Sequence, residues 1–144
     1  MDFITIKKLV DELGFERGKY ALFGSSPLAA HGIREANDID MVVTLDLYEK
    51  LKESGWKEEA YPVTEKRGLT KDKFEVFYEW NYVGYTPDVM KIIREADIID
   101  DVPVVRLEEV LKWKIAFGRE KDLKDVELIK KFMRENNSIL KNKV

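Results

Sequence analysis

The sequence contains no cysteine among its 144 residues. This absence excludes disulfide bonds, thiolate metal ligands and a cysteine nucleophile. It suits a cytoplasmic protein, which is the location we expect. No apolar stretch approaches the roughly 20 residues of a membrane span, and no signal peptide is visible at the N-terminus. We therefore expect no membrane partner.

An excess of basic charge is also missing. The formal net charge is −3, so no global basic field draws the protein onto nucleic acid or anionic lipid, although a local basic patch is compatible with this value. Histidine occurs once, as His31, near the end of a predicted helix. An imidazole in that position is ordinary, and we assign it no catalytic role.

What is present indicates one globular domain. The composition is 44% hydrophobic and 37% charged, and the length is sufficient for one hydrophobic core. No repeat or flexible linker divides the chain. We expect a single domain over residues 1–144, with a core at about 18–106 and a helical C-terminal part at about 107–136.

Hydrophobic periodicity and turn residues predict alternating helices and strands. The expected helices span residues 4–14, 26–32, 46–54, 86–94, 107–118 and 122–136. The expected strands span residues 20–23, 38–44 and 74–80, with two short strands within 96–105 and a strand or hairpin within 56–72. This order predicts an α/β (α+β) fold, with a mixed β-sheet, helices packed on it and two C-terminal helices.

The turn Gly24-Ser25-Ser26 lies where the first strand ends and a helix begins. Such a turn presents unpaired backbone N–H groups and the positive end of a helix dipole, which together bind phosphate. The Ser25 hydroxyl could add another donor. A serine before Pro27 is also an ordinary helix cap, so both interpretations remain open.

Asp38 and Asp40 flank a single isoleucine at the start of an apolar run. On a strand both carboxylates would project to the same side, about 7 Å apart. Carboxylates paired in this way can share Mg²⁺, which takes oxygen ligands from proteins and from substrate phosphates. Alternatively, one aspartate begins the strand and the other is solvated at an edge.

A third carboxylate could come from the strand at 74–80, where Glu75, Phe77 and Glu79 share one face. If this strand lies beside that of Asp38, Glu75 could complete a site for two metal ions. Two ions stabilise the attacking and leaving oxygens of an in-line displacement. Spacing alone favours the simpler interpretation, in which Glu75 and Glu79 line the solvated face of a half-exposed strand.

Basic side chains supply further candidates. Lys114 falls within the apolar arc of the helix at 107–118, so its ammonium needs an anionic partner, either a triphosphate or a buried carboxylate. Arg34 has the planar fork that suits phosphate or carboxylate. We interpret Asp122 and Asp125 as structural, with Asp122 as a helix cap and Arg119 or Lys121 as ion-pair partners.

These features together resemble the nucleotidyltransferase superfamily with the DNA polymerase β-like fold, in its small single-domain bacterial and archaeal form. The matching segments are Gly24-Ser25, Arg34 to Asp40, Glu75 within Phe74-Glu75-Val76-Phe77, and the tail from Leu111 to Asp125. Two positions depart from the family pattern. Ala36 replaces the usual threonine, and Glu75 replaces the commoner aspartate.

The resemblance implies a Mg²⁺-dependent enzyme that transfers a nucleoside monophosphate from an NTP, in the first place ATP, to an acceptor hydroxyl with release of pyrophosphate. It implies catalytic and metal-binding roles for Asp38, Asp40 and Glu75, with two Mg²⁺ ions. It implies nucleotide-binding roles for Gly24, Ser25, Ser26, Arg34 and Lys114.

Other functions remain open from the sequence. The acceptor could be an RNA 3′ end, a protein hydroxyl or a small molecule. The changes at Ala36 and Glu75 are also compatible with a catalytically inactive nucleotide- or metal-binding module that acts as a regulatory partner in a complex. A third reading is a structural interaction domain whose carboxylates form only ion pairs.

Overall fold

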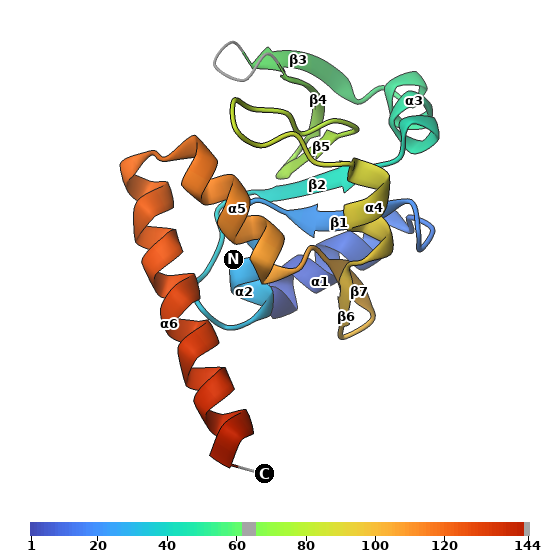
Figure 1. The fold of residues 1–144 in the computed structure, drawn as a ribbon. Coiled ribbons are helices and arrows are strands. Elements are labelled where there is room, and N and C mark those ends of the chain that lie inside the picture. The colour runs from blue at the N-terminus through green and yellow to red at the C-terminus, as the bar shows by residue number, and fades with distance from the viewer. Residues whose placement is uncertain (62–65, 143–144) are drawn as a thin grey trace.

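The computed structural model describes residues 1–61 and 66–142, and its elements are labelled in Figure 1. The helices are α1 (Phe3–Leu13), α2 (Ser26–Ala30), α3 (Leu45–Glu53), α4 (Val89–Arg94), α5 (Leu107–Phe117) and α6 (Glu120–Asn142). The strands are β1 (Tyr20–Phe23), β2 (Ile39–Val43), β3 (Lys57–Tyr61), β4 (Lys66–Lys71), β5 (Phe74–Phe77), β6 (Asp97–Ile99) and β7 (Val102–Val104).

The strands of the described part form one seven-stranded mixed sheet in the order β3-β4-β5-β2-β1-β7-β6. Two neighbouring pairs, β2 with β5 and β1 with β7, run parallel. The other neighbours run antiparallel. The parallel pairs need long connections, and these connections carry α2, α3 and α4, whereas α1 precedes β1 and α5 and α6 follow β7.

Alternation along β2 divides the core into two layers. Ile39, Met41 and Val43 pack in one buried cluster with residues of α1 and α3. Val42 packs on the opposite face of the sheet, in a cluster with residues of α4, α5 and α6. Asp40 has the same parity as Val42, so it lies on the face covered by these three helices. Helix α6 follows α5 and projects beyond the sheet toward the C-terminus (Figure 1).

This architecture confirms the predicted fold class, and several local signals confirm their elements. Gly14 ends α1 in the left-handed conformation, at φ 65°. Asp100 and Asp101 both have positive φ and join β6 to β7 as a two-residue hairpin turn. The hairpin expected within 56–72 is the antiparallel pair β3 and β4, although residues 62–65 lie outside the described part.

The predicted strand at 74–80 is too long. Strand β5 ends at Phe77, and Glu79 is an exposed residue beyond it. The cause is Trp80, whose ring stacks on Phe23 at a centroid distance of 4.5 Å and meets Phe77 edge to face. Trp80 thus lies on the same side of the sheet as Phe77, which an extended strand would not allow.

Other boundaries also differ from the prediction. Strand β2 begins at Ile39, so Asp38 lies just before it. Helix α4 begins at Val89, because the side chain of Asp88 caps it by accepting from the backbone N–H of Lys91. Helix α6 begins at Glu120. Within the described residues, no helix is both long and apolar enough to cross a bilayer.

Candidate functional site

A pocket of about 440 Å³ lies where β1, β2 and β5 meet helices α5 and α6. Its charged and polar lining comes from the turn after β1, the loop before β2, strands β2 and β5, and the two C-terminal helices with the short segment between them. These residues are Gly24, Ser25, Arg34, Asn37, Asp38, Asp40, Glu75, Lys114, Arg119, Lys121, Asp122 and Asp125. Four aromatic residues complete the lining, namely Phe77, Trp80, Trp113 and Phe117.

Carboxylates from two adjacent strands meet at this pocket. Asp40 on β2 is the register partner of Glu75 on β5, and the two strands are parallel. Register partners project to the same face of a sheet, so these two carboxylates share the pocket side. Asp38 is exposed, precedes β2 and lines the same pocket. The three acidic residues that the sequence singled out therefore all line one pocket.

The turn after β1 packs directly against Asp40. Gly24 has a φ of 65°, a conformation that residues with a side chain rarely adopt. A Cβ atom at this position would lie 2.4 Å from Oδ2 of Asp40. Glycine is therefore required both for the turn and for the close approach of the turn to the carboxylate.

The two serines of the turn have different environments. Ser25 forms no side-chain cap for α2, and its Oγ instead accepts a hydrogen bond of 2.9 Å from Nη2 of Arg34. Because Oγ acts as an acceptor there, its own hydrogen can be donated into the pocket. Ser26 is buried and does not line the pocket. Its hydroxyl donates to the backbone oxygen of Asp38 at 3.5 Å, and so supports the main chain at Asp38.

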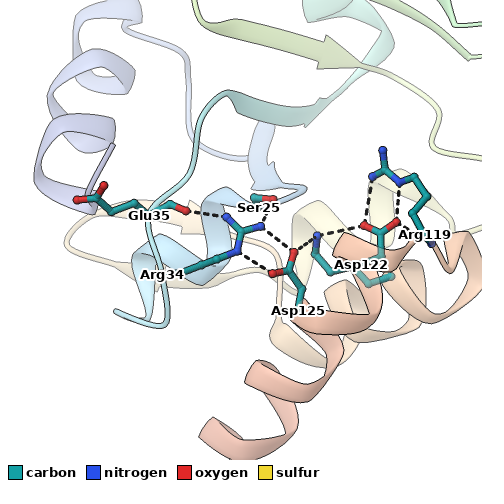
Figure 2. Close-up of polar contacts among 7 residues, drawn as sticks. Ser25, Arg34, Glu35, Arg119, Asp122 and Asp125 are labelled. Carbon is teal, nitrogen blue, oxygen red and sulfur yellow. Dashed lines mark hydrogen bonds and ion pairs between the residues drawn. The ribbon is translucent and has the colours of Figure 1, made fainter.

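Asp125 of α6 joins two basic residues beneath the turn (Figure 2). Arg34 donates to both carboxylate oxygens of Asp125, through Nε and Nη2, at 2.7 Å each. Nζ of Lys114 lies 2.8 Å from Asp125 and 3.6 Å from Asp122. Lys114 is only 3% exposed, so carboxylates are the anionic partners that its burial demands.

Asp122 continues the network toward Arg119. Nε and Nη2 of Arg119 donate to the Asp122 carboxylate at 2.6 and 3.1 Å, and its backbone N–H donates to the same carboxylate at 3.2 Å. The predicted ion pair with Arg119 is confirmed. The predicted role of Asp122 as the N-cap residue is wrong, because Asp122 lies in the first turn of α6. Its carboxylate accepts from the backbone N–H of Arg119, the residue just before α6, which is one half of a capping box.

These contacts favour the charged forms of Asp125 and Arg34. Burial would raise the pKa of Asp125, but hydrogen bonds from Arg34 and Lys114 outweigh it and lower the pKa. The hydrogen bond to Asp125 raises the pKa of Arg34. With Arg119 and Asp122 included, the network has three cations and two carboxylates. This network, with one excess positive charge, lines the same pocket as Asp38, Asp40 and Glu75.

The donor set suits a hard divalent cation, which takes carboxylate oxygens and keeps positions for water or phosphate. Asp40 and Glu75 would hold such an ion, with Asp38 beside them at the pocket. In the part of the chain that the structure describes, no group of three or more acidic or histidine side chains is gathered closely enough to hold a metal ion. A site for two Mg²⁺ ions therefore stays a prediction.

Several pocket residues were not singled out as site candidates from the sequence. Trp113, Phe117 and Lys121 reach the pocket because α5 and α6 pack over the sheet. Asn37 directly precedes Asp38, and Phe77 and Trp80 lie at the end of β5 and just beyond it. Arg119 lies just before α6 and Asp122 lies in its first turn, and this three-residue spacing was the usable signal for the pair. Neither Glu79 nor His31 lines the pocket. His31 packs edge to face on Phe132, and burial lowers its pKa.

Comparisons with known proteins identify the fold. No protein-family model and no curated protein sequence matches the chain. The crystal structure of a Thermotoga maritima protein described as a "putative nucleotidyltransferase" superposes with a TM-score of 0.56 at 18% sequence identity, and the match covers 91% of each chain. The chain therefore has a nucleotidyltransferase-like fold.

Proposed function

We propose that the protein is a nucleotidyltransferase that moves a nucleoside monophosphate from an NTP to an acceptor hydroxyl and releases pyrophosphate. The observation that carries this proposal is the meeting of three elements at one pocket. The Gly24-Ser25 turn, the carboxylates of Asp38, Asp40 and Glu75, and the buried ammonium of Lys114 all line it. The fold shared with the Thermotoga maritima protein supports the same class of reaction.

The pocket combines groups for both parts of the reaction. The Ser25 hydroxyl and the excess positive charge around Lys114 would bind the β- and γ-phosphates. Asp38, Asp40 and Glu75 would hold Mg²⁺, which when bound supplies charge neutralisation on the phosphates. Asp40 and Glu75, held in register on adjacent strands, would orient the acceptor hydroxyl, and its proton would pass to a carboxylate. Catalysis of this kind is mostly positioning and charge stabilisation.

The test measures pyrophosphate release and incorporation of labelled nucleotide with Mg²⁺ and each NTP in turn. RNA, protein and small hydroxyl compounds are offered separately as acceptors. We expect Asp38→Asn and Asp40→Asn each to lower transfer about a hundredfold or more. Their melting temperatures should equal or exceed that of the wild type, because each change relieves repulsion between neighbouring carboxylates.

Glu79→Gln is the matched control, since Glu79 is an exposed acid outside the pocket. It should leave transfer unchanged. Full Mg²⁺-dependent transfer by either aspartate variant would refute the assigned roles. NTP binding by calorimetry without incorporation into any acceptor would instead identify a binding module that lacks transfer activity.

A further inference from the structure

Part of the hydrophobic core around Val42 reaches the pocket as an aromatic wall beside the charged groups. We define this aromatic wall as Phe77, Trp80, Trp113 and Phe117, all of which line the pocket. A triphosphate and a divalent cation bind to charged groups and polar donors, so the four aromatic rings add no binding energy for either. An apolar wall beside a charged surface instead matches a ligand with one anionic end and one flat apolar end.

Ring packing holds this wall in a fixed shape. Trp113 meets Trp80 edge to face at a centroid distance of 5.3 Å. Phe117 lies 4.6 Å from Trp113 between centroids, with a tilt of 30°. Trp80 is stacked on Phe23 of β1, which is fully buried. The wall is therefore anchored to the sheet and presents a preformed surface to the pocket.

Phe117 lies at the solvent-exposed edge of this wall. It is partly exposed, whereas Phe77, Trp80 and Trp113 are buried. The guanidinium carbon of Arg119 lies 4.0 Å from the centre of the Phe117 ring. The planar guanidinium therefore lies over the phenyl ring, and its outer face is a flat surface on which a nucleobase can stack.

We propose, resting on the proposed function, that the aromatic wall binds the nucleobase of the NTP, with Phe117 and Arg119 as the contacts at the rim. The volume of about 440 Å³ lies in the range of pockets that hold ligands of this size. Stacking accepts every base, because each has a π-face. The wall therefore selects nucleotides over inorganic triphosphate and favours purines, which offer the larger ring area.

The test compares binding of ATP and of inorganic triphosphate, each with Mg²⁺, by calorimetry. The wild type should bind ATP more tightly than triphosphate. Phe117→Leu keeps an apolar side chain but removes the ring, so it should weaken ATP binding about fivefold or more. The same variant should bind triphosphate as the wild type does. Phe132→Leu, which removes a partly buried ring outside the pocket, is the matched control and should change neither affinity.

Tryptophan emission gives a second readout that does not depend on a packing variant. Trp80 and Trp113 line the pocket, whereas Trp56 packs in the cluster on the other face of the sheet. ATP should therefore change the emission of Trp56→Phe, and inorganic triphosphate should change it much less.

Two results would overturn the inference. If triphosphate binds as tightly as ATP, or if Phe117→Leu binds ATP as tightly as the wild type, the wall does not hold the base, and the proposed transferase function still stands. If neither ligand binds, the inference and the proposed function both fail.

Discussion

At the scale of single residues, Gly24 and Asp40 constrain each other. The turn after β1 reaches the sheet only because Gly24 has no side chain, and the Asp40 carboxylate fills the space that a Cβ would take. The phosphate-binding turn and the metal-binding carboxylate of the proposed site are therefore one packing unit. A change in one residue displaces the other.

Gly24→Ala tests this coupling. The new methyl would lie 2.4 Å from Oδ2 of Asp40, so the carboxylate or the turn has to shift. We expect loss of at least about 1 kcal/mol in the free energy of unfolding and a much larger proportional loss of transfer. Chemical denaturation and the transfer assay measure the two effects.

Gly14→Ala is its matched control. Gly14 has the same φ of 65°, and no atom lies within 4 Å of the position a Cβ would take. It should lose stability from the strained backbone alone and keep full transfer activity. Equal loss of transfer in both variants would show that the contact between position 24 and Asp40 does not cause the loss of activity in Gly24→Ala.

Local chemistry in the sequence singled out several residues that line one pocket in the structure. The acid-isoleucine-acid pattern and the glycine-serine turn identified Asp38, Asp40, Gly24 and Ser25 as neighbours of one pocket. Their catalytic roles remain predictions. The separate environments of Ser25 and Ser26 were not predictable, because they depend on Arg34, nine residues further along, and on the main chain at Asp38.

At the scale of elements, Asp125 attaches α6 to the rest of the site. Its carboxylate accepts from Arg34, in the loop before β2, and from Lys114 of α5. Since Arg34 in turn donates to Ser25, one residue of α6 supports the turn that is proposed to bind phosphate. The position of α6 is thereby coupled to the geometry of the pocket.

Asp125→Asn should destabilise the protein by about 3 kcal/mol at pH 7, because it leaves buried cations without their shared carboxylate. The pKa of Asp125 in the folded state lies below its unfolded value of about 3.9. The contribution of ionised Asp125 to the free energy of unfolding is therefore fully present above the unfolded-state pKa, and it is lost as pH falls through the folded-state pKa. The difference in the free energy of unfolding between Asp125→Asn and the wild type should become smaller below about pH 4. Chemical denaturation at a series of pH values measures this difference.

Lys114→Met is the companion variant. It leaves Arg34 paired with Asp125 and Arg119 paired with Asp122, so each carboxylate keeps one arginine. It should cost only about 1 kcal/mol and should weaken triphosphate binding. A loss from Lys114→Met as large as that from Asp125→Asn would contradict this account of the network.

Element boundaries were predictable where a local signal decided them and not where distant packing did. Gly14 and the Asp100-Asp101 turn act through their own backbone, and both were predicted. The end of β5 depends on Trp80 stacking on Phe23, more than fifty residues earlier in the chain. Aromatic and acidic residues alternate as far as Trp80, so the sequence pattern predicted a strand up to that residue. In the structure the strand ends at Phe77, because Trp80 turns to stack on Phe23.

At the scale of the whole molecule, the site exists because of strand order. The pairing of β2 with β5 places Asp40 next to Glu75, although α3, β3 and β4 separate them in the chain. The fold class was predictable from the alternation of elements. The register between β2 and β5 was not, because no local feature of either strand encodes its partner. The same holds for the aromatic wall, which forms only when α5 packs over the sheet.

The most direct measurement of the central claim is a crystal structure of the protein with Mg²⁺ and a non-hydrolysable NTP. We predict the triphosphate between Ser25 and Lys114, with Mg²⁺ on Asp40 and Glu75. A nucleotide bound elsewhere on the protein, or a metal ion that avoids both carboxylates, would contradict the assignment of this pocket to nucleotide transfer.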